Sequence, residues 1–172
     1  MRADAFASSV EALNDIVGSV THHRLVVLSR GGGGLDALIG FRSSANVLAA
    51  APLRGAALAV RVFLDARDPS GDAARPITGY DYALLDRDGV ELLAYHWHPG
   101  RGGLGQDAPH VHVSAALRPG RASGNAAILS LDKRHLLTGP VALAGFLGML
   151  VGEFGIAPVA ADWRARLAPP VP

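Results

Sequence analysis

Two pairs of histidines are the residues of this sequence whose type and spacing are best suited to chemistry. His96 and His98 flank a tryptophan, and His110 and His112 flank a valine, so four of the 7 histidines lie in His-x-His pairs. Side chains at positions i and i+2 of a strand point to the same face of a sheet. If the two pairs lie on neighbouring strands in matching register, four imidazoles share one surface patch.

Metal binding is the first chemistry open to such a patch. Histidine is the commonest metal ligand in proteins, and a His-x-His pair on a strand supplies two nitrogens to one ion. Because the chain has no cysteine, a divalent metal such as zinc has to be held by histidine and carboxylate. The expected metal ligands are His96, His98, His110 and His112, to which Asp81 or Asp107 can add a carboxylate.

Metal-free acid–base cleavage of a phosphodiester is the second chemistry. Two histidines can act as base and acid in such a reaction, and arginines can hold the phosphate. The expected catalytic residues are His110, His112 and His135. The expected substrate-binding residues are Arg101, Arg118 and Tyr95.

A structural role for the histidines is the third alternative. Histidines on a half-exposed sheet face can pack beside aromatic residues and satisfy their hydrogen bonds without catalysing anything. The protein is then a non-catalytic interaction module, in which exposed aromatic residues and the Gly31–Gly34 loop contact a partner. That partner is another protein or, in a homodimer, a second copy of this chain.

A β-hairpin has to position the first histidine pair. Strands are expected at residues 80–85 and 90–98, on either side of the strong turn sequence Asp86-Arg87-Asp88-Gly89. A further strand at 110–117 carries the second pair and follows a glycine-rich connection. Since 11 residues separate His98 from His110, the chain has room to fold the later strand back beside the earlier one.

The register of this hairpin decides which face the histidines occupy. A two-residue turn places Tyr80 opposite Tyr95, so that the aromatic side chains lie on the face opposite the histidines, and we favour this register. A left-handed bulge residue at Gly89 instead places Tyr80 opposite His96. A shift of one residue therefore exchanges the two faces of the strand.

Helices are expected near both ends of the chain, because residues 4–21 and 141–154 carry apolar residues at three- and four-residue spacing. Strands are expected at 24–29, 56–65 and 126–131, and residues 35–54 stay open between strand and helix. We therefore expect one α+β domain over residues 1–172. It has a mainly antiparallel meander, an N-terminal and a C-terminal helix, and a loosely packed tail from about residue 158.

Composition limits the partners. The chain has 16 Lys and Arg against 15 Asp and Glu, so it lacks the basic excess of a nucleic-acid-binding surface, and an RNA substrate would need a local pocket. The apolar run at 140–150 is about half of the roughly 20 residues that a membrane span needs. Acidic residues interrupt the apolar part of the N-terminus, unlike a secretory signal. We expect a cytoplasmic protein that does not associate with membranes.

Residues 80–155 also resemble a known pattern. Its parts are the tyrosine-rich hairpin, Tyr95-His96-Trp97-His98-Pro99, Pro109-His110-Val111-His112, His135-Leu136-Leu137-Thr138-Gly139, and a final helix ending in Glu153-Phe154-Gly155. This pattern resembles a family of bacterial proteins that is in turn distantly similar to the TumE-like proteins of toxin–antitoxin loci. The resemblance implies a bacterial, toxin-like RNase whose partner is an antitoxin.

Overall fold

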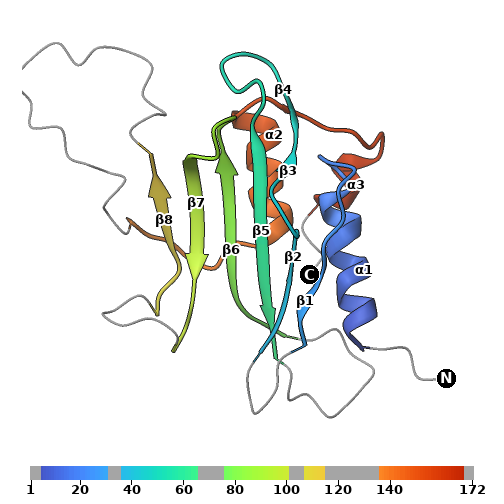
Figure 1. Ribbon diagram of the computed structural model, residues 1–172, viewed down its shortest axis with the longest axis vertical. Coiled ribbons are helices and arrows are strands. Elements are labelled where there is room, and N and C mark those ends of the chain that lie inside the picture. Colours follow the sequence, from blue (N-terminus) through green and yellow to red (C-terminus); the bar gives the residue numbers. More distant parts are fainter. Residues whose placement is uncertain (1–4, 31–35, 66–75, 101–106, 115–135, 169–172) are drawn as a thin grey trace, which may run out of the picture.

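Figure 1 shows the computed structural model, which describes residues 5–30, 36–65, 76–100, 107–114 and 136–168. Within these ranges the chain forms helices and one large antiparallel sheet, which confirms the expected α+β class. The helices are α1 (Ala5–Val17), α2 (Leu143–Glu153) and α3 (Trp163–Arg166). The strands are β1 (Val26–Ser29), β2 (Ala37–Gly40), β3 (Ala45–Asn46), β4 (Leu48–Ala49), β5 (Ala57–Leu64), β6 (Ile77–Leu85), β7 (Glu91–Trp97), β8 (His110–Val113), β9 (Leu136–Leu137) and β10 (Ile156–Ala157). None of the helices in these ranges is long and apolar enough to cross a membrane.

The large sheet is an antiparallel meander over most of its width. Its strands follow the order β1-β2-β5-β6-β7-β8-β9, and β3 also pairs with β5. The strands β5 to β8 are neighbours in the sequence as well as in space (Figure 1), so each returns beside the one before it. This arrangement brings the two His-x-His pairs onto the adjacent strands β7 and β8.

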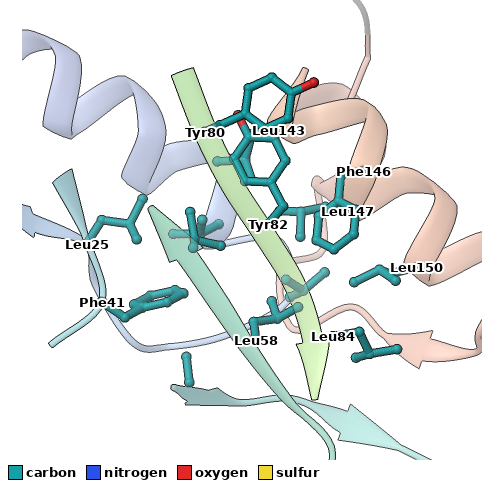
Figure 2. Close-up of a cluster of buried hydrophobic side chains, with 14 of the residues drawn as sticks. Leu25, Phe41, Leu58, Tyr80, Tyr82, Leu84, Leu143, Phe146, Leu147 and Leu150 are labelled. Carbon is teal, nitrogen blue, oxygen red and sulfur yellow. The ribbon is translucent and has the colours of Figure 1, made fainter. Parts of the chain in front are cut away.

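The hydrophobic core lies between one face of this sheet and the helices α1 and α2. Figure 2 shows α2 side chains such as Phe146 and Leu147 against Tyr82 of β6. The ring centroids of Tyr82 and Phe146 are 5.6 Å apart, and both side chains are fully buried. Because successive strand residues point to opposite faces, the neighbours of these core residues, among them Asp81, project from the other face.

The segment between β1 and β5 resolves the ambiguity of residues 35–54 in favour of strands. β2 and β3 both pair with β5, and β4 pairs with β10. A further short strand, β9, forms because Leu136 and Leu137 pair with β8. The expected strand at 126–131 and residues 115–117 of the expected strand at 110–117 lie outside the described residues.

The turn of the β6–β7 hairpin is a three-residue loop with glycine in a left-handed conformation. The N–H of Asp86 donates to the Val90 carbonyl at 2.8 Å, and Gly89 has a φ of 80°. Side-chain capping stabilises the loop, because the Asp86 carboxylate accepts hydrogen bonds from two backbone N–H groups. A second irregularity follows, since Leu84 pairs with Leu93 and Leu85 pairs with Glu91.

These two irregularities give a register that differs from both of the expected ones. Tyr80 lies opposite Trp97, and not opposite Tyr95 or His96. Each added residue exchanges the faces of the strand, so two additions restore the original faces. The aromatic side chains therefore point into the core, and Asp81 and His96, which pair directly, lie on the opposite face.

Candidate metal centre

One row of paired polar residues crosses the sheet on the face opposite the helices. Arg61 of β5 pairs with Asp81 of β6, Asp81 pairs with His96 of β7, and His96 pairs with His110 of β8. Residues directly opposite one another on antiparallel strands project from the same face. A guanidinium, a carboxylate and two imidazoles thus lie side by side on this face.

Asp81 is the centre of the closest contacts in this row. Its Oδ1 atom lies 2.7 Å from Nδ1 of His96 and 2.7 Å from Nε2 of His98. The three side chains are 22 %, 22 % and 24 % exposed, respectively, so the group is sheltered and still accessible from solvent. An ionised carboxylate only accepts hydrogen bonds, so each of these two nitrogens carries a proton and donates it.

The same three residues have the donor atoms and spacing of a metal site. One carboxylate oxygen and one nitrogen from each histidine all lie within 4.8 Å of one another. Tetrahedral zinc with ligands at about 2.0–2.1 Å separates neighbouring ligand atoms by roughly 3.3 Å. An ion between Asp81, His96 and His98 therefore needs the two 2.7 Å contacts to open by a few tenths of an ångström, with the ion replacing their protons. Within the described residues no other group meets this spacing.

The second histidine pair completes a cluster around His96, which we call the histidine cluster (His96, His98, His110 and His112). The ring of His96 has centroid distances of 5.8 Å to His98, 5.7 Å to His110 and 5.0 Å to His112. The rings of His110 and His112 are 5.1 Å apart. The structure therefore brings the four imidazoles into one patch, and their roles as ligands or catalysts stay predictions.

His110 is the most deeply buried member of the histidine cluster. It is 3 % exposed, and its Nδ1 lies 3.0 Å from the carbonyl oxygen of Ala108. Because a carbonyl only accepts, Nδ1 carries the proton. In neutral His110 the other nitrogen, Nε2, is then the atom that can accept a proton or bind a metal.

The charges around Asp81 favour its ionised form. Burial raises the pKa of the Asp81 carboxyl, whereas the hydrogen bond from His96 and the charges of His98, His96 and Arg61 lower it. The lowering effects together exceed the effect of burial, so the pKa lies below its usual value. Glu91 adds a second carboxylate, 4.0 Å from Nε2 of His96. The site therefore combines negative charge with nitrogen donors, as a cation site requires.

Several other expected site residues lie elsewhere. Tyr95, expected to bind substrate, points to the core face, where its ring lies 5.9 Å from that of Phe146 and its hydroxyl 3.9 Å from the Met149 sulfur. Asp107 accepts a hydrogen bond from the Gly100 N–H at 2.8 Å and is not part of the metal-spaced group. The expected residues Arg101, Arg118 and His135 lie outside the described residues.

The tyrosines of β6 lie on the face opposite the histidines, as expected from the favoured register. Tyr80 and Tyr82 are 3 % and 0 % exposed, so neither belongs to the exposed aromatic surface that the interaction-module alternative requires. Two-fold alternation along β6 turns both side chains into the core. The Gly31–Gly34 loop of the same alternative lies outside the part of the chain that the structure describes.

Arg61 was not among the expected site residues, although the sequence contains a signal for it. It is the one charged residue in the otherwise apolar strand Ala57–Leu64, so alternation alone places it on the face opposite the core. Comparisons with protein-family models, with curated proteins and with solved structures gave no match. The functional argument therefore rests on the geometry of this face.

Proposed function

We propose that this protein is a metal-dependent hydrolase that cleaves a phosphodiester, with a divalent transition metal bound by Asp81, His96 and His98. The observation that carries the proposal is the convergence of two imidazole nitrogens on one carboxylate oxygen, each at 2.7 Å. A set of three protein ligands leaves a coordination position open for water or substrate, as in catalytic zinc sites. Zinc fits these donors, since nitrogen and oxygen ligands both suit it.

The metal would supply an activated water and positive charge at the reacting phosphate. The protein's own side chains would hold the metal and transfer protons. His96 and His98 are oriented by the β7 strand and by their shared contact with Asp81. Partial burial of the site strengthens the attraction between the Asp81 carboxylate and a bound cation.

His110 and His112 are the proposed acid–base pair beside this metal. Nε2 of His110 can accept a proton from the attacking water, since its Nδ1 is held by the Ala108 carbonyl. His112, whose ring is 5.1 Å from that of His110, can then protonate the leaving oxygen when the P–O bond breaks. General acid–base catalysis of this kind contributes about 10²- to 10⁴-fold to a rate.

Hydrolysis of a chromogenic phosphodiester, bis(4-nitrophenyl) phosphate, tests this proposal. The wild-type protein should hydrolyse it with added zinc or manganese and lose this activity in a chelator. The double variant His110→Ala, His112→Ala should bind metal and lose about 10²-fold or more of the rate. His22→Ala, His23→Ala is the matched control, since both residues are exposed and lie before β1, at the other end of the sheet order.

Two outcomes would overturn the metal-dependent mechanism. Activity that persists in the chelator and disappears in the His110→Ala, His112→Ala variant would favour metal-free acid–base catalysis. Equal activity in that variant and in the control would exclude both mechanisms.

A toxin-like RNase is the narrower form of the proposal, and it follows from the resemblance of residues 80–155. In this form the phosphodiester belongs to RNA and the partner is an antitoxin. Expression of the wild-type chain in bacteria should arrest growth with RNA degradation, whereas the His110→Ala, His112→Ala variant should not. Unimpaired growth and intact RNA with the wild-type chain would contradict it.

A non-catalytic interaction module is the second candidate, and one observation favours it. Leu136 and Leu137 are 41 % and 73 % exposed on β9, the last strand in the sheet order. Exposed apolar edge strands are templates for pairing with another chain. In that case sedimentation should show a homodimer that Leu137→Lys converts to a monomer. A wild-type monomer would count against self-association.

A further inference from the structure

We infer that Arg42 and Arg61 form a phosphate-binding subsite beside the histidine cluster. The inference rests on the proposed function and extends it, because the subsite would hold a second phosphate group of the substrate, adjacent to the phosphodiester that is cleaved. Its basis is a pocket on the β2–β3 side of β5 that the proposed reaction does not use.

The pocket arises where residues 41–44, between β2 and β3, bulge away from β5. Gly40 pairs with Arg61 and Ala45 pairs with Leu58, so the four residues 41–44 lie opposite only residues 59 and 60. The two extra residues cannot follow the edge of β5 and must bulge away from it. The space that remains is lined by the polar residues Arg42, Ser43, Ser44 and Arg61, together with Phe41, Ala59 and Val60.

The lining has the chemistry of an anion site. Two guanidinium groups can each donate paired hydrogen bonds to a phosphate, and two serine hydroxyls can add further donors. All four side chains belong to exposed residues, so a ligand can reach them from solvent. Within the described residues the ion pairs of the Asp81 carboxylate are with His96 and His98 and not with Arg61.

The size of the pocket favours a small anion. Its volume is about 100 Å³, whereas pockets that enclose drug-sized ligands measure about 300–1,000 Å³. A phosphate group fits this description better than a whole nucleotide does. The remainder of the substrate would then lie outside the pocket.

Arg61 connects this pocket with the histidine cluster. It pairs with Asp81 on the neighbouring strand, and neighbouring strands lie about 4.8 Å apart. Its stem lies over Gly40, where an added Cβ would be 3.4 Å from the Arg61 Cγ. A phosphate in the pocket would lie on the β2–β3 side of Arg61, so β5 and β6 separate it from the proposed metal. The subsite would therefore hold a neighbouring phosphate group of the substrate and not the scissile one.

Titration of inorganic phosphate into metal-free protein, followed by calorimetry in the presence of a chelator, tests the inference. Arg42→Gln and Arg61→Gln should each weaken phosphate binding by about tenfold or more, as expected for the loss of charged hydrogen bonds. The matched control is Arg164→Gln, because Arg164 lies on α3 and packs over the Trp163 ring at 4.4 Å. Its phosphate affinity should equal that of the wild type.

The outcome is independent of metal binding, so the two proposals can fail separately. Equal phosphate affinity in the wild type, Arg42→Gln and Arg61→Gln, or no binding by the wild type at millimolar phosphate, overturns the subsite whatever zinc does. Loss of phosphate binding in Arg42→Gln and Arg61→Gln supports the subsite even if zinc fails to bind. Circular dichroism melting of each variant verifies that it is folded.

Discussion

Asp81 Oδ1 accepts a hydrogen bond from Nδ1 of His96 at 2.7 Å, across directly paired positions of β6 and β7. The contact orients the imidazole and determines which of its nitrogens carries the proton. The same oxygen also contacts His98, so one carboxylate organises both members of the first His-x-His pair. The properties of the site should therefore depend on Asp81 more than on any other single residue.

Acid titration should reveal the contribution of Asp81 to stability. Its folded pKa lies below its usual value, while an aspartate in an unfolded chain has a pKa of about 3.9. The stability linked to its ionisation is therefore fully present above about pH 4 and is lost as the pH falls through the folded pKa. Urea unfolding between pH 6 and pH 2 should show a smaller acid loss for Asp81→Asn than for the wild type.

The control for this titration is Asp88→Asn, in the exposed hairpin loop. The Asp88 side chain is 70 % exposed, and its ion pair within the described residues is with Arg87, which is 78 % exposed. Its pH profile should match that of the wild type. Parallel acid losses in Asp81→Asn and the wild type would show that the histidine contacts do not stabilise the carboxylate.

Two buried tyrosines should respond differently to loss of their hydroxyl groups. The Tyr80 hydroxyl accepts a hydrogen bond from the Val141 N–H at 2.8 Å, just before α2, whereas the buried Tyr82 hydroxyl has no hydrogen-bond partner among the described residues. Tyr80→Phe should lower the free energy of unfolding by about 1 kcal/mol, and Tyr82→Phe should be neutral or stabilising. Chemical denaturation at pH 7 measures both, and the reverse order would contradict this packing.

Substitution of Gly40 should disturb the packing of β2 against β5 next to Arg61. An added Cβ would lie 2.7 Å from the Val60 carbonyl oxygen and 3.1 Å from Leu28 Cδ1, so Gly40→Ala should destabilise the protein by about 1–3 kcal/mol. Gly145→Ala in α2 is the comparison, since no described atom lies within 4 Å of its Cβ position. It should stabilise the protein by up to about 1 kcal/mol, because alanine favours a helix. Similar thermal shifts in both variants would contradict this prediction.

The sequence predicted the elements of the site better than their arrangement. Two-residue spacing was sufficient to predict that each His-x-His pair shares a face, because side chains alternate along a strand. It could not predict the hairpin register, since that depends on a glycine loop and on the extra residue between Leu84 and Leu85 and their partners. The histidines lie on the face that the favoured register predicted, but only because the two one-residue shifts of the hairpin cancel in their effect on the face.

Asp81 and Arg61 show what local patterns leave open. Asp81 was one of two carboxylates that could join the histidines, and only the pairing of β6 with β7 distinguishes it from Asp107. Arg61 joins the site through the pairing of β5 with β6, which brings together residues that are distant in the sequence. Such long-range pairings are set by the packing of the whole sheet, so no short window of sequence contains them.

Zinc binding by the purified protein is the most direct measurement of the proposed metal centre. The wild type and the His22→Ala, His23→Ala control should bind one zinc ion, which chelator removes with a drop in melting temperature. Asp81→Asn, His96→Ala and His98→Ala should each weaken zinc binding by more than about tenfold, and His110→Ala, His112→Ala should retain it. Absence of zinc from the wild type, or equal affinity in His96→Ala and the control, would contradict a metal centre on Asp81, His96 and His98.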